Sequence, residues 1–193
     1  AVRDAILGQQ PKDFDLATDA NPDEIIKIAE KHNLKSLPVG KAFGVVVVNG
    51  EEIATFRKDI GKGRRPDAVE FTDIQTDVKR RDLTVNALFY DIECGEIVDL
   101  VGGIEDLKNK QIRMVGNAKD RLEEDPLRKL RVLRFAGKLS SKIDDATIEA
   151  IRDNPSLKGV SNERIHDEFI KAIQASKSTE SLLQLAQDLD LLQ

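Results

Sequence analysis

The sequence predicts an α+β protein in which a part built on a small mixed sheet precedes an all-helical part. Up to about residue 115, runs rich in β-branched residues and hairpin signals alternate with short helical patterns. From Ala118 onward strand signals vanish, and apolar residues recur at helical spacing. A chain of 193 residues allows one large domain or two small ones. We therefore expect two domains, residues 1–116 and 117–193.

The first domain is predicted to hold a packing helix and a β-hairpin. Asn21-Pro22-Asp23 opens the helix, whose apolar residues keep helical spacing to about Asn33. Asn49-Gly50 between two β-rich runs is the strongest short hairpin signal. The elements expected here are hairpin strands at 43–48 and 51–57, a mobile basic loop at 58–67 and a strand at 68–72.

The remaining elements follow from the same patterns of periodicity and of turn residues. Those expected before residue 117 are a short helix at 83–89, a strand at 96–100, a short helix at 104–108 and a strand at 111–115. Those expected after it are five helices, at 119–123, 126–139, 145–152, 162–175 and 179–189.

Composition excludes several classes of protein. With 40% hydrophobic and 34% charged residues, the profile is that of a globular protein rather than a disordered or fibrous one. The apolar runs are too short for a membrane span, and no signal peptide is visible. Cys94 alone can form no internal disulfide, and together with His32 and His166 it is too little for a zinc site. The predicted location is the cytoplasm.

Net charge alone argues against nucleic-acid binding, because 30 Lys and Arg face 35 Asp and Glu, a balance of −5. The distribution indicates otherwise, since residues 128–142 contain six basic side chains and no acidic one. Three of these, Arg128, Arg131 and Arg134, are spaced by three residues, which on a helix keeps them within an arc of about 120°. They form one cationic face. Without other motifs it would be a solvated or an RNA-phosphate-binding face.

Asp13-Phe14-Asp15 places two carboxylates on one face of an extended segment, with Phe14 directed into a core. Two like charges this close need a counter-charge, and Mg²⁺ is a hard cation that prefers oxygen ligands. The alternative is a pair of solvated acids at a strand edge. The triplet alone does not decide between these interpretations.

Three longer motifs carry a resemblance to a known family. They are VRDAILG with DFDLAT (residues 2–8 and 13–18), RRDLTVNAL (80–88) and EDPLRKLRVLRF (124–135). Supporting matches are EIATFR (52–57), GRRPD (63–67), DLVGGIEDL (99–107) and SNERIHDE (161–168). Together they span nearly the whole chain, which resembles the class II tRNA nucleotidyltransferases and bacterial poly(A) polymerases, a branch of the polymerase-beta superfamily.

The resemblance implies a polymerase-beta-like nucleotidyltransferase head followed by a helical neck. In the family the residues matching Asp13 and Asp15 bind two Mg²⁺ ions. Glu52 is the candidate for a third carboxylate; Glu51 competes with it, and strand alternation puts the two on opposite faces. The residues that the resemblance assigns to the nucleotide are Arg3, Arg81, Asp82, Asp125, Arg128, Arg131 and Arg134. Of these, Asp125 and Arg128 are implied to read the base of CTP or ATP.

The implied reaction is template-independent addition of CMP and AMP, from CTP and ATP, to the 3′ end of tRNA. The first alternative is a poly(A) polymerase acting on RNA 3′ ends, because such enzymes share these motifs. The second is a catalytically inactive RNA-binding fragment. It arises because the Gly-Gly pair that precedes VRDAILG in the family, and that is expected to cradle the triphosphate, is missing from the given sequence. We expect a minimal enzyme, a fragment, or a chain that relies on a partner chain or oligomer.

Overall fold

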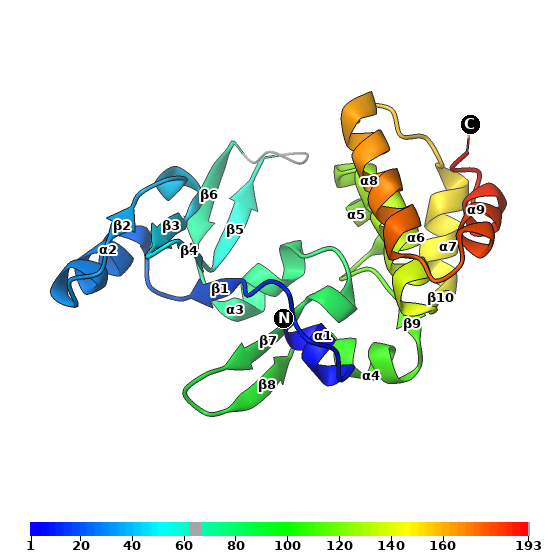
Figure 1. Cartoon of the computed structure of the whole chain (residues 1–193). Helices are drawn as coiled ribbons and strands as arrows, with labels where there is room; N and C mark the ends of the chain where they lie inside the picture. Colours follow the sequence, from blue (N-terminus) through cyan, green and yellow to red (C-terminus); the bar gives the residue numbers. More distant parts are fainter. Residues whose placement is uncertain (62–66, 193) are drawn as a thin grey trace. The chain divides into compact units, whose positions relative to one another are not determined.

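A computed structural model describes residues 1–61 and 67–192 (Figure 1). The chain divides into two compact units, Ala1–Arg80 and Arg81–Gln193, which we describe separately. The α+β class is confirmed, because small sheets occur together with a cluster of helices near the C-terminus. The domain boundary at residue 116 stays a prediction.

The first unit contains a four-stranded mixed sheet in the order β1-β4-β3-β2. Its strands are β1 (Leu16–Thr18), β2 (Ser36–Leu37), β3 (Val45–Val48) and β4 (Glu51–Thr55). β1 runs parallel to β4, whereas β3 is antiparallel to both β4 and β2. The predicted hairpin is therefore confirmed. Its turn residues Asn49 and Gly50 have φ of 52° and 95°, as a tight two-residue hairpin turn requires.

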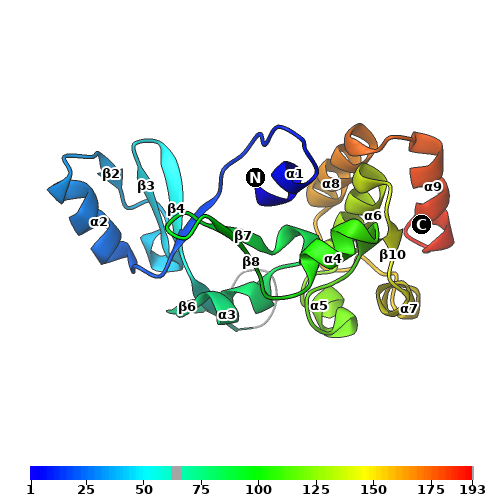
Figure 2. The same ribbon diagram turned by 90° about the horizontal axis from the view of Figure 1, so that it is seen from below.

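Helix α2 (Pro22–Lys31) covers one face of this sheet (Figure 2). Asn21 caps its N-terminus, accepting hydrogen bonds from the backbone of Asp23 and Glu24, and Glu24 accepts one in return from the Asn21 backbone. The buried side chains of this layer are Ile25, Ala29, Val46 and Val48. The predicted helix and its start are thus confirmed.

Three elements of the first unit differ from prediction, one strand and two short helices. The expected loop at 58–67 begins inside a strand, because β5 (Arg57–Ile60) pairs antiparallel with β6 (Ala68–Phe71). The pairing supplies the backbone of residues 58–60 with partners that the local sequence does not reveal. The rest of that expected loop, at residues 62–66, lies outside the described residues. Short helices that sequence patterns missed are α1 (Val2–Ile6) and α3 (Ile74–Asp77).

The second unit opens with a 3₁₀ turn, Thr84–Asn86, followed by a hairpin of β7 (Leu88–Asp91) and β8 (Glu96–Asp99). The helix expected at 83–89 is therefore wrong, because its last residues pair with β8 instead of closing a helical turn. The strand expected at 96–100 and the helix expected at 104–108 are confirmed by β8 and by α4 (Gly103–Lys108).

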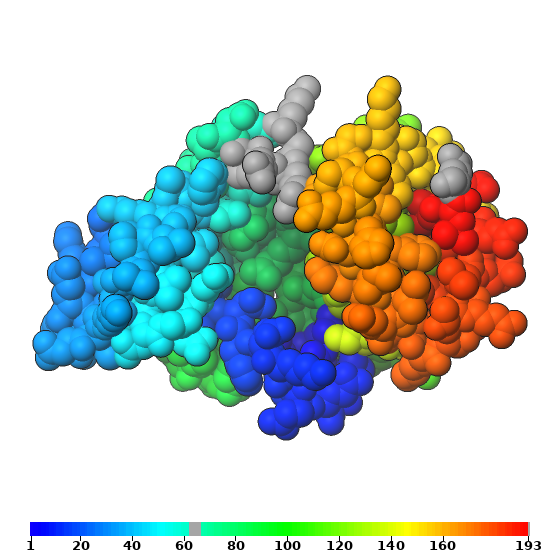
Figure 3. Space-filling view, turned by 45° about the horizontal axis from the view of Figure 1, so that its top comes forward, coloured from blue at the N-terminus to red at the C-terminus, as the bar shows by residue number. Residues whose placement is uncertain are grey.

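The helices after residue 117 follow prediction closely. They are α5 (Ala118–Glu124), α6 (Leu127–Leu139), α7 (Asp145–Asp153), α8 (Asn162–Ala175) and α9 (Thr179–Asp188). α6 packs along α8, and in the space-filling view α8 and α9 share one face, in orange and red (Figure 3). Gly137 of α6 permits the close approach of α9, because a Cβ there would lie 2.9 Å from Leu182 Cδ1. In the described part of the chain, no helix has the length and apolar character to cross a membrane.

One short strand contradicts the all-helical second part. β10 (Lys142–Ile143) pairs parallel with β9 (Gln111–Ile112), so strand structure does continue beyond Ala118. A strand of two residues is too short to show the alternation of apolar and polar residues that predicts a strand. Its pairing partner also lies about thirty residues earlier along the chain. The strand expected at 111–115 is correspondingly short, with only an isolated bridge from Met114 to Leu83 beyond it.

Candidate active site

Asp13 and Asp15 lie between α1 and β1, at the start of the sheet's edge strand. Both are exposed, and neither forms a hydrogen bond or ion pair with any described residue. The expectation that Phe14 points into a core is wrong, because its side chain is 65% exposed. Strand pairing begins only at Leu16, so no facing layer covers residue 14.

The sheet register separates Glu51 from Glu52. Ile53, on β4, packs against the core under α2, so Glu51 shares the core-facing side of the strand while Glu52 and Ala54 point the other way. In the parallel pair, Ala17 lies opposite Ala54. If the alternation of side chains along β1 continues back to residue 13, Asp13 and Asp15 lie on the same face of the sheet as Ala17. Glu52 lies on that face too. The register favours Glu52 over Glu51.

The donor chemistry of this segment fits a divalent cation, because carboxylate oxygens are the ligands that Mg²⁺ prefers. Asp13 and Asp15 are also not committed to any cationic side chain among the described residues. No group of three His, Cys, Asp or Glu side chains suited to a metal ion occurs in residues 1–61 and 67–192.

Arg3 lies on α1 beside Asp4, and the two side chains form an ion pair with N···O distances of 2.6 and 2.8 Å. The Arg3 side chain is only 14% exposed. No helix was predicted here, but the family resemblance assigns Arg3 to the nucleotide. The structure shows that its guanidinium already uses two donors on the neighbouring carboxylate.

Asp82 joins its own segment to α6 through a charged pair. Its carboxylate accepts hydrogen bonds from the Leu83 backbone N–H at 2.7 Å and from Arg131 Nε, on α6, at 2.6 Å. Arg131 Nη2 lies 2.6 Å from the same oxygen. Asp82 and Arg131 were both predicted to serve the nucleotide, and the structure brings them together although 49 residues separate them.

Burial by itself would raise the pKa of Asp82, but the positive charge of Arg131 and the hydrogen bonds from Leu83, Arg131 and Asn86 outweigh it and hold that pKa below the ordinary carboxyl value. Asp82 is therefore ionised at neutral pH, as a hydrogen-bond acceptor for a hydroxyl group must be. Its neighbour Arg81 lies over the Phe89 ring, with 4.3 Å from the guanidinium carbon to the ring centroid.

Protein groups in the described part of the chain hold both carboxylate oxygens of Asp125, the predicted base-reading acid, but only one nitrogen of its partner Arg128. Arg128 uses Nη1 to bond the Arg121 backbone oxygen at 2.7 Å and Glu124 at 2.9 Å. Among the described residues, its Nε and Nη2 donate to no protein group. Asp125 accepts hydrogen bonds from the Leu127 backbone N–H and from Arg164 Nη2, each at 3.2 Å. A free guanidinium edge is what hydrogen bonding to a base needs.

The expected cationic face on α6 is less open than its spacing suggests. Arg134 bonds Glu168 of α8 at 2.5 Å and stacks on the Phe135 ring at 4.4 Å. Lys129, which belongs to the basic stretch 128–142, is buried and donates to the Ser156 backbone oxygen at 2.6 Å. Burial lowers the pKa of Lys129, against the opposing charge of Glu123. Arg134 and Lys129 are therefore held by protein groups, whereas the Arg131 side chain remains 34% exposed.

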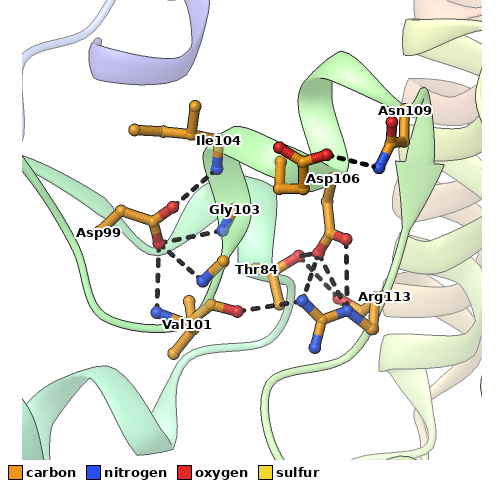
Figure 4. A network of polar contacts seen from close by, with 10 residues as sticks. Thr84, Asp99, Val101, Gly103, Ile104, Asp106, Asn109 and Arg113 are labelled. Carbon is orange, nitrogen blue, oxygen red and sulfur yellow. Dashed lines mark hydrogen bonds and ion pairs between the residues drawn. The ribbon is translucent and has the colours of Figure 1, made fainter.

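The motif DLVGGIEDL builds a polar network beside the Asp82 segment (Figure 4). Asp99 accepts hydrogen bonds from four successive backbone N–H groups, Val101 to Ile104, at 2.8 to 3.1 Å. Buried Asp106 accepts from Thr84 Oγ1 at 2.5 Å and from Arg113 Nε. A Cβ on Gly103 would lie 2.2 Å from the Thr84 carbonyl oxygen, so only glycine fits.

Sequence reasoning missed the side chains that hold these candidates in place. Arg121, Arg164 and Glu168 each pair with a residue of the site, and Arg113 with Asp106 braces the turn after Asp82. Two of them, Arg164 and Glu168, lie in SNERIHDE, which was recognised as a motif without a role. Arg121 was missed because its bond to the Arg81 backbone oxygen joins residues forty positions apart, although its other partner, Glu124, lies on the same helix.

Two known protein families match the sequence of this chain. Residues 1–113 match the family described as the poly A polymerase head domain, and residues 142–193 match the probable RNA and SrmB-binding site of polymerase A. The first match covers more than half of the chain. The fold and motifs thus define a member of the polymerase-beta superfamily with the head domain of that class. The chain belongs to the family of class II tRNA nucleotidyltransferases and bacterial poly(A) polymerases.

Three relatives illustrate the family. A CCA-adding enzyme of Enterococcus faecalis is 45% identical over 90% of this chain and 43% of its own length. A poly(A) polymerase I of Salmonella typhi is 37% identical over 95% of this chain and 43% of its own. The crystal structure of the Bacillus stearothermophilus CCA-adding enzyme in complex with CTP superposes with a TM-score of 0.85 at 36% identity, covering 99% of this chain and 47% of that one. The chain spans less than half the length of these relatives.

The ion pair of Asp82 predicts a pH-dependent stability. Asp82→Asn should lower the free energy of unfolding at neutral pH by about 1–3 kcal/mol, because Arg131 loses its charged partner. The folded-state pKa of Asp82 is depressed, so its contribution is complete above the unfolded-state pKa and is lost as pH falls through the folded-state value. Urea unfolding from about pH 7 to about pH 3 measures this difference.

Exposed Asp153 provides the matched control, since Asp153→Asn removes the same charge from the surface of α7. That variant should stay within about 0.5 kcal/mol of wild type. A stability gap between wild type and Asp82→Asn that stays constant down to acid pH would contradict the proposed ion pair.

Proposed function

We propose that this protein adds CMP and AMP, from CTP and ATP, to the 3′ end of tRNA without a nucleic-acid template. The observation that carries the proposal is similarity over 99% of the chain to a CCA-adding enzyme crystallised with CTP. That similarity spans both the acidic segment and the arginine-bearing helix. We also propose that residues 1–116 act as the catalytic head and residues 117–193 as the neck, supported by the family match over residues 1–113.

In this proposal Asp13 and Asp15 hold the divalent cations, with Glu52 as third carboxylate. Mg²⁺ bound there would activate the RNA 3′-hydroxyl and stabilise the departing pyrophosphate. The support is the absence of any competing ion pair on Asp13 and Asp15 among the described residues, together with the sheet register that favours Glu52. Glu52 could alternatively accept the proton of the attacking hydroxyl.

The residues of the second unit are proposed to bind the nucleotide. Ionised Asp82 accepts a hydrogen bond from a ribose hydroxyl, and Arg81 donates to ribose or phosphate oxygens. Asp125 and Arg128 present an acceptor and donors to the base edge. A site that pairs fully with one base leaves buried polar groups unpaired with another, and this penalty gives selectivity. Arg3, Arg131 and Arg134 contribute to nucleotide binding in this proposal, and their ion pairs fix their positions.

A poly(A) polymerase is the second candidate, favoured by the 37% identity to the Salmonella typhi enzyme. A catalytically inactive RNA-binding fragment is the third. The proposed partners are tRNA or another RNA 3′ end, with CTP and ATP, and a partner chain or oligomer could complete the tRNA grip. The cytoplasm is the proposed compartment, because the single cysteine, Cys94, suits a reducing environment.

Substitution of the acidic segment tests the catalytic assignment. Asp13→Asn or Asp15→Asn should slow nucleotide addition on the order of 1,000-fold, because each removes a metal ligand, while leaving the fold intact. Glu52→Gln should also slow addition, and Glu51→Gln, its neighbour on the opposite face of β4, is the matched control. Equal effects at Glu51 and Glu52 would refute the choice of third carboxylate, and an active Asp13→Asn would refute the metal site.

The product of the reaction separates the candidate functions. With tRNA lacking its 3′ CCA, Mg²⁺ and labelled nucleotides, we expect CMP incorporation followed by a single AMP, and no addition after chelation of the metal. Long runs of AMP without CMP would identify the poly(A) polymerase instead. RNA binding without any nucleotide uptake would leave only the inactive RNA-binding fragment.

A further inference from the structure

Arg121 is a buried arginine on α5 to which no role in nucleotide recognition has been assigned. It is 9% exposed, although arginine is almost never found buried without partners. It lies three residues before Glu124, at the start of the EDPLRKLRVLRF motif, and forty residues after Arg81 of the RRDLTVNAL motif. All of the contacts considered below lie within the second unit.

The Arg121 guanidinium joins two segments that are distant in sequence. Its Nη2 donates to the Arg81 backbone oxygen at 2.8 Å, and its Nη1 pairs with Glu124 at the C-terminal end of α5. A planar guanidinium can hold two acceptors at a fixed separation, which an ammonium group cannot do. Arg121 therefore sets the distance between the Arg81 backbone and the end of α5.

The backbone of Arg121 also contacts a predicted nucleotide-binding residue, Arg128. Its carbonyl oxygen accepts a hydrogen bond from Arg128 Nη1 at 2.7 Å, and the same Nη1 donates to Glu124 at 2.9 Å. Arg121 thus touches the carriers of both predicted nucleotide contacts, Arg81 and Arg128. Arg128 keeps its Nε and Nη2 free of described protein groups, so these contacts orient the guanidinium without occupying its other edge.

The stacking of the Arg81 side chain acts together with the hydrogen bond from Arg121 to the Arg81 backbone. The Arg81 side chain stacks on Phe89, which fixes its direction only if its backbone is fixed too. The next residue is held separately, because the Asp82 backbone oxygen accepts a hydrogen bond from the Val115 N–H at 2.9 Å. Arg121 is the side chain from α5 that completes this support.

We propose that Arg121 is a positioning residue that fixes Arg81 and Arg128 relative to each other, so that the contact to ribose or phosphate and the contact to the base fall on the same nucleotide. This inference rests on the proposed function for the identity of the ligand, a pyrimidine or purine nucleoside triphosphate. Arg121 touches no nucleotide itself. Its effect passes through Arg81, Glu124 and Arg128.

Arg121→Lys tests the proposal with little change in charge or volume. A lysine can pair with Glu124 but cannot also hold the Arg81 carbonyl, so we expect the preference for CTP over UTP in kcat/KM to fall by about tenfold or more. Arg152→Lys, on the exposed face of α7, is the matched control and should leave that preference unchanged. Circular dichroism and thermal unfolding check that each variant is folded at the assay temperature.

A merely structural arginine gives a different result: a lower midpoint of thermal unfolding with an unchanged CTP-to-UTP ratio. That result would overturn the proposal. If Arg121→Lys does not fold, Glu124→Gln serves instead, because it weakens the hold on Arg121 and Arg128 without removing either. It should reduce the same ratio in the same direction, and an unchanged ratio would again overturn the proposal.

Equilibrium titration of the full chain with CTP and with UTP separates this inference from the proposed function. If the wild-type chain binds CTP in preference to UTP but adds no nucleotide, the proposed activity fails, and the binding preference of Arg121→Lys still decides the role of Arg121. If Arg121→Lys shows the same preference for CTP over UTP in binding as wild type, the positioning role is wrong, whether or not the protein adds nucleotides.

Discussion

The structure of the second unit depends on the pairing of arginines with carboxylates that come from other segments. Arg131 meets Asp82, Arg134 meets Glu168, and Arg128 meets Glu124. A partly buried guanidinium without such a partner would carry an uncompensated charge, which is costly in a low-dielectric environment. The pairs therefore do two things: they let a helix this basic pack against its neighbours, and they leave each guanidinium in one orientation. A side chain that is to recognise a nucleotide needs a fixed orientation, because the ordering cost is then met before binding.

Close backbone approach is the second constraint on the site. Gly103 permits α4 to start directly against the Thr84 carbonyl oxygen, and the buried Asp106 beside it accepts a hydrogen bond from the Thr84 hydroxyl. Asp99 meanwhile accepts four backbone N–H groups in that turn, and although burial would raise the pKa of Asp99, these hydrogen bonds lower it. A carboxylate so bonded stays ionised and rigid. The residues of the motif DLVGGIEDL thus have a structural role, because they brace the turn that carries Asp82.

Local sequence was sufficient for the elements whose signals are local. The helix that starts after Asn21 and the hairpin around Asn49-Gly50 follow directly from capping and turn chemistry, and the helices after residue 117 follow from apolar spacing. The failures share one physical cause. β5 and β7 exist because the next strand along the chain pairs with each, and β10 because a strand about thirty residues earlier pairs with it, so their own residues carry no sufficient local pattern. Among the candidate site residues, motifs identified Asp82 and Arg131 but not that they bind each other. The exposure of Phe14 shows the same limit, since alternation predicts a face but not whether anything covers it.

The fixed arginines and the ionised Asp82 support the central claim of the proposed function. We propose that protein side chains, rather than a nucleic-acid template, select the nucleotide. Equilibrium binding of all four ribonucleoside triphosphates to the wild-type chain, in the presence of Mg²⁺ and without RNA, tests it most directly. We expect CTP and ATP to bind at least about tenfold more tightly than UTP and GTP, since a mismatched base edge leaves Asp125 and Arg128 without hydrogen-bond partners. Equal affinity for the four nucleotides would contradict the claim.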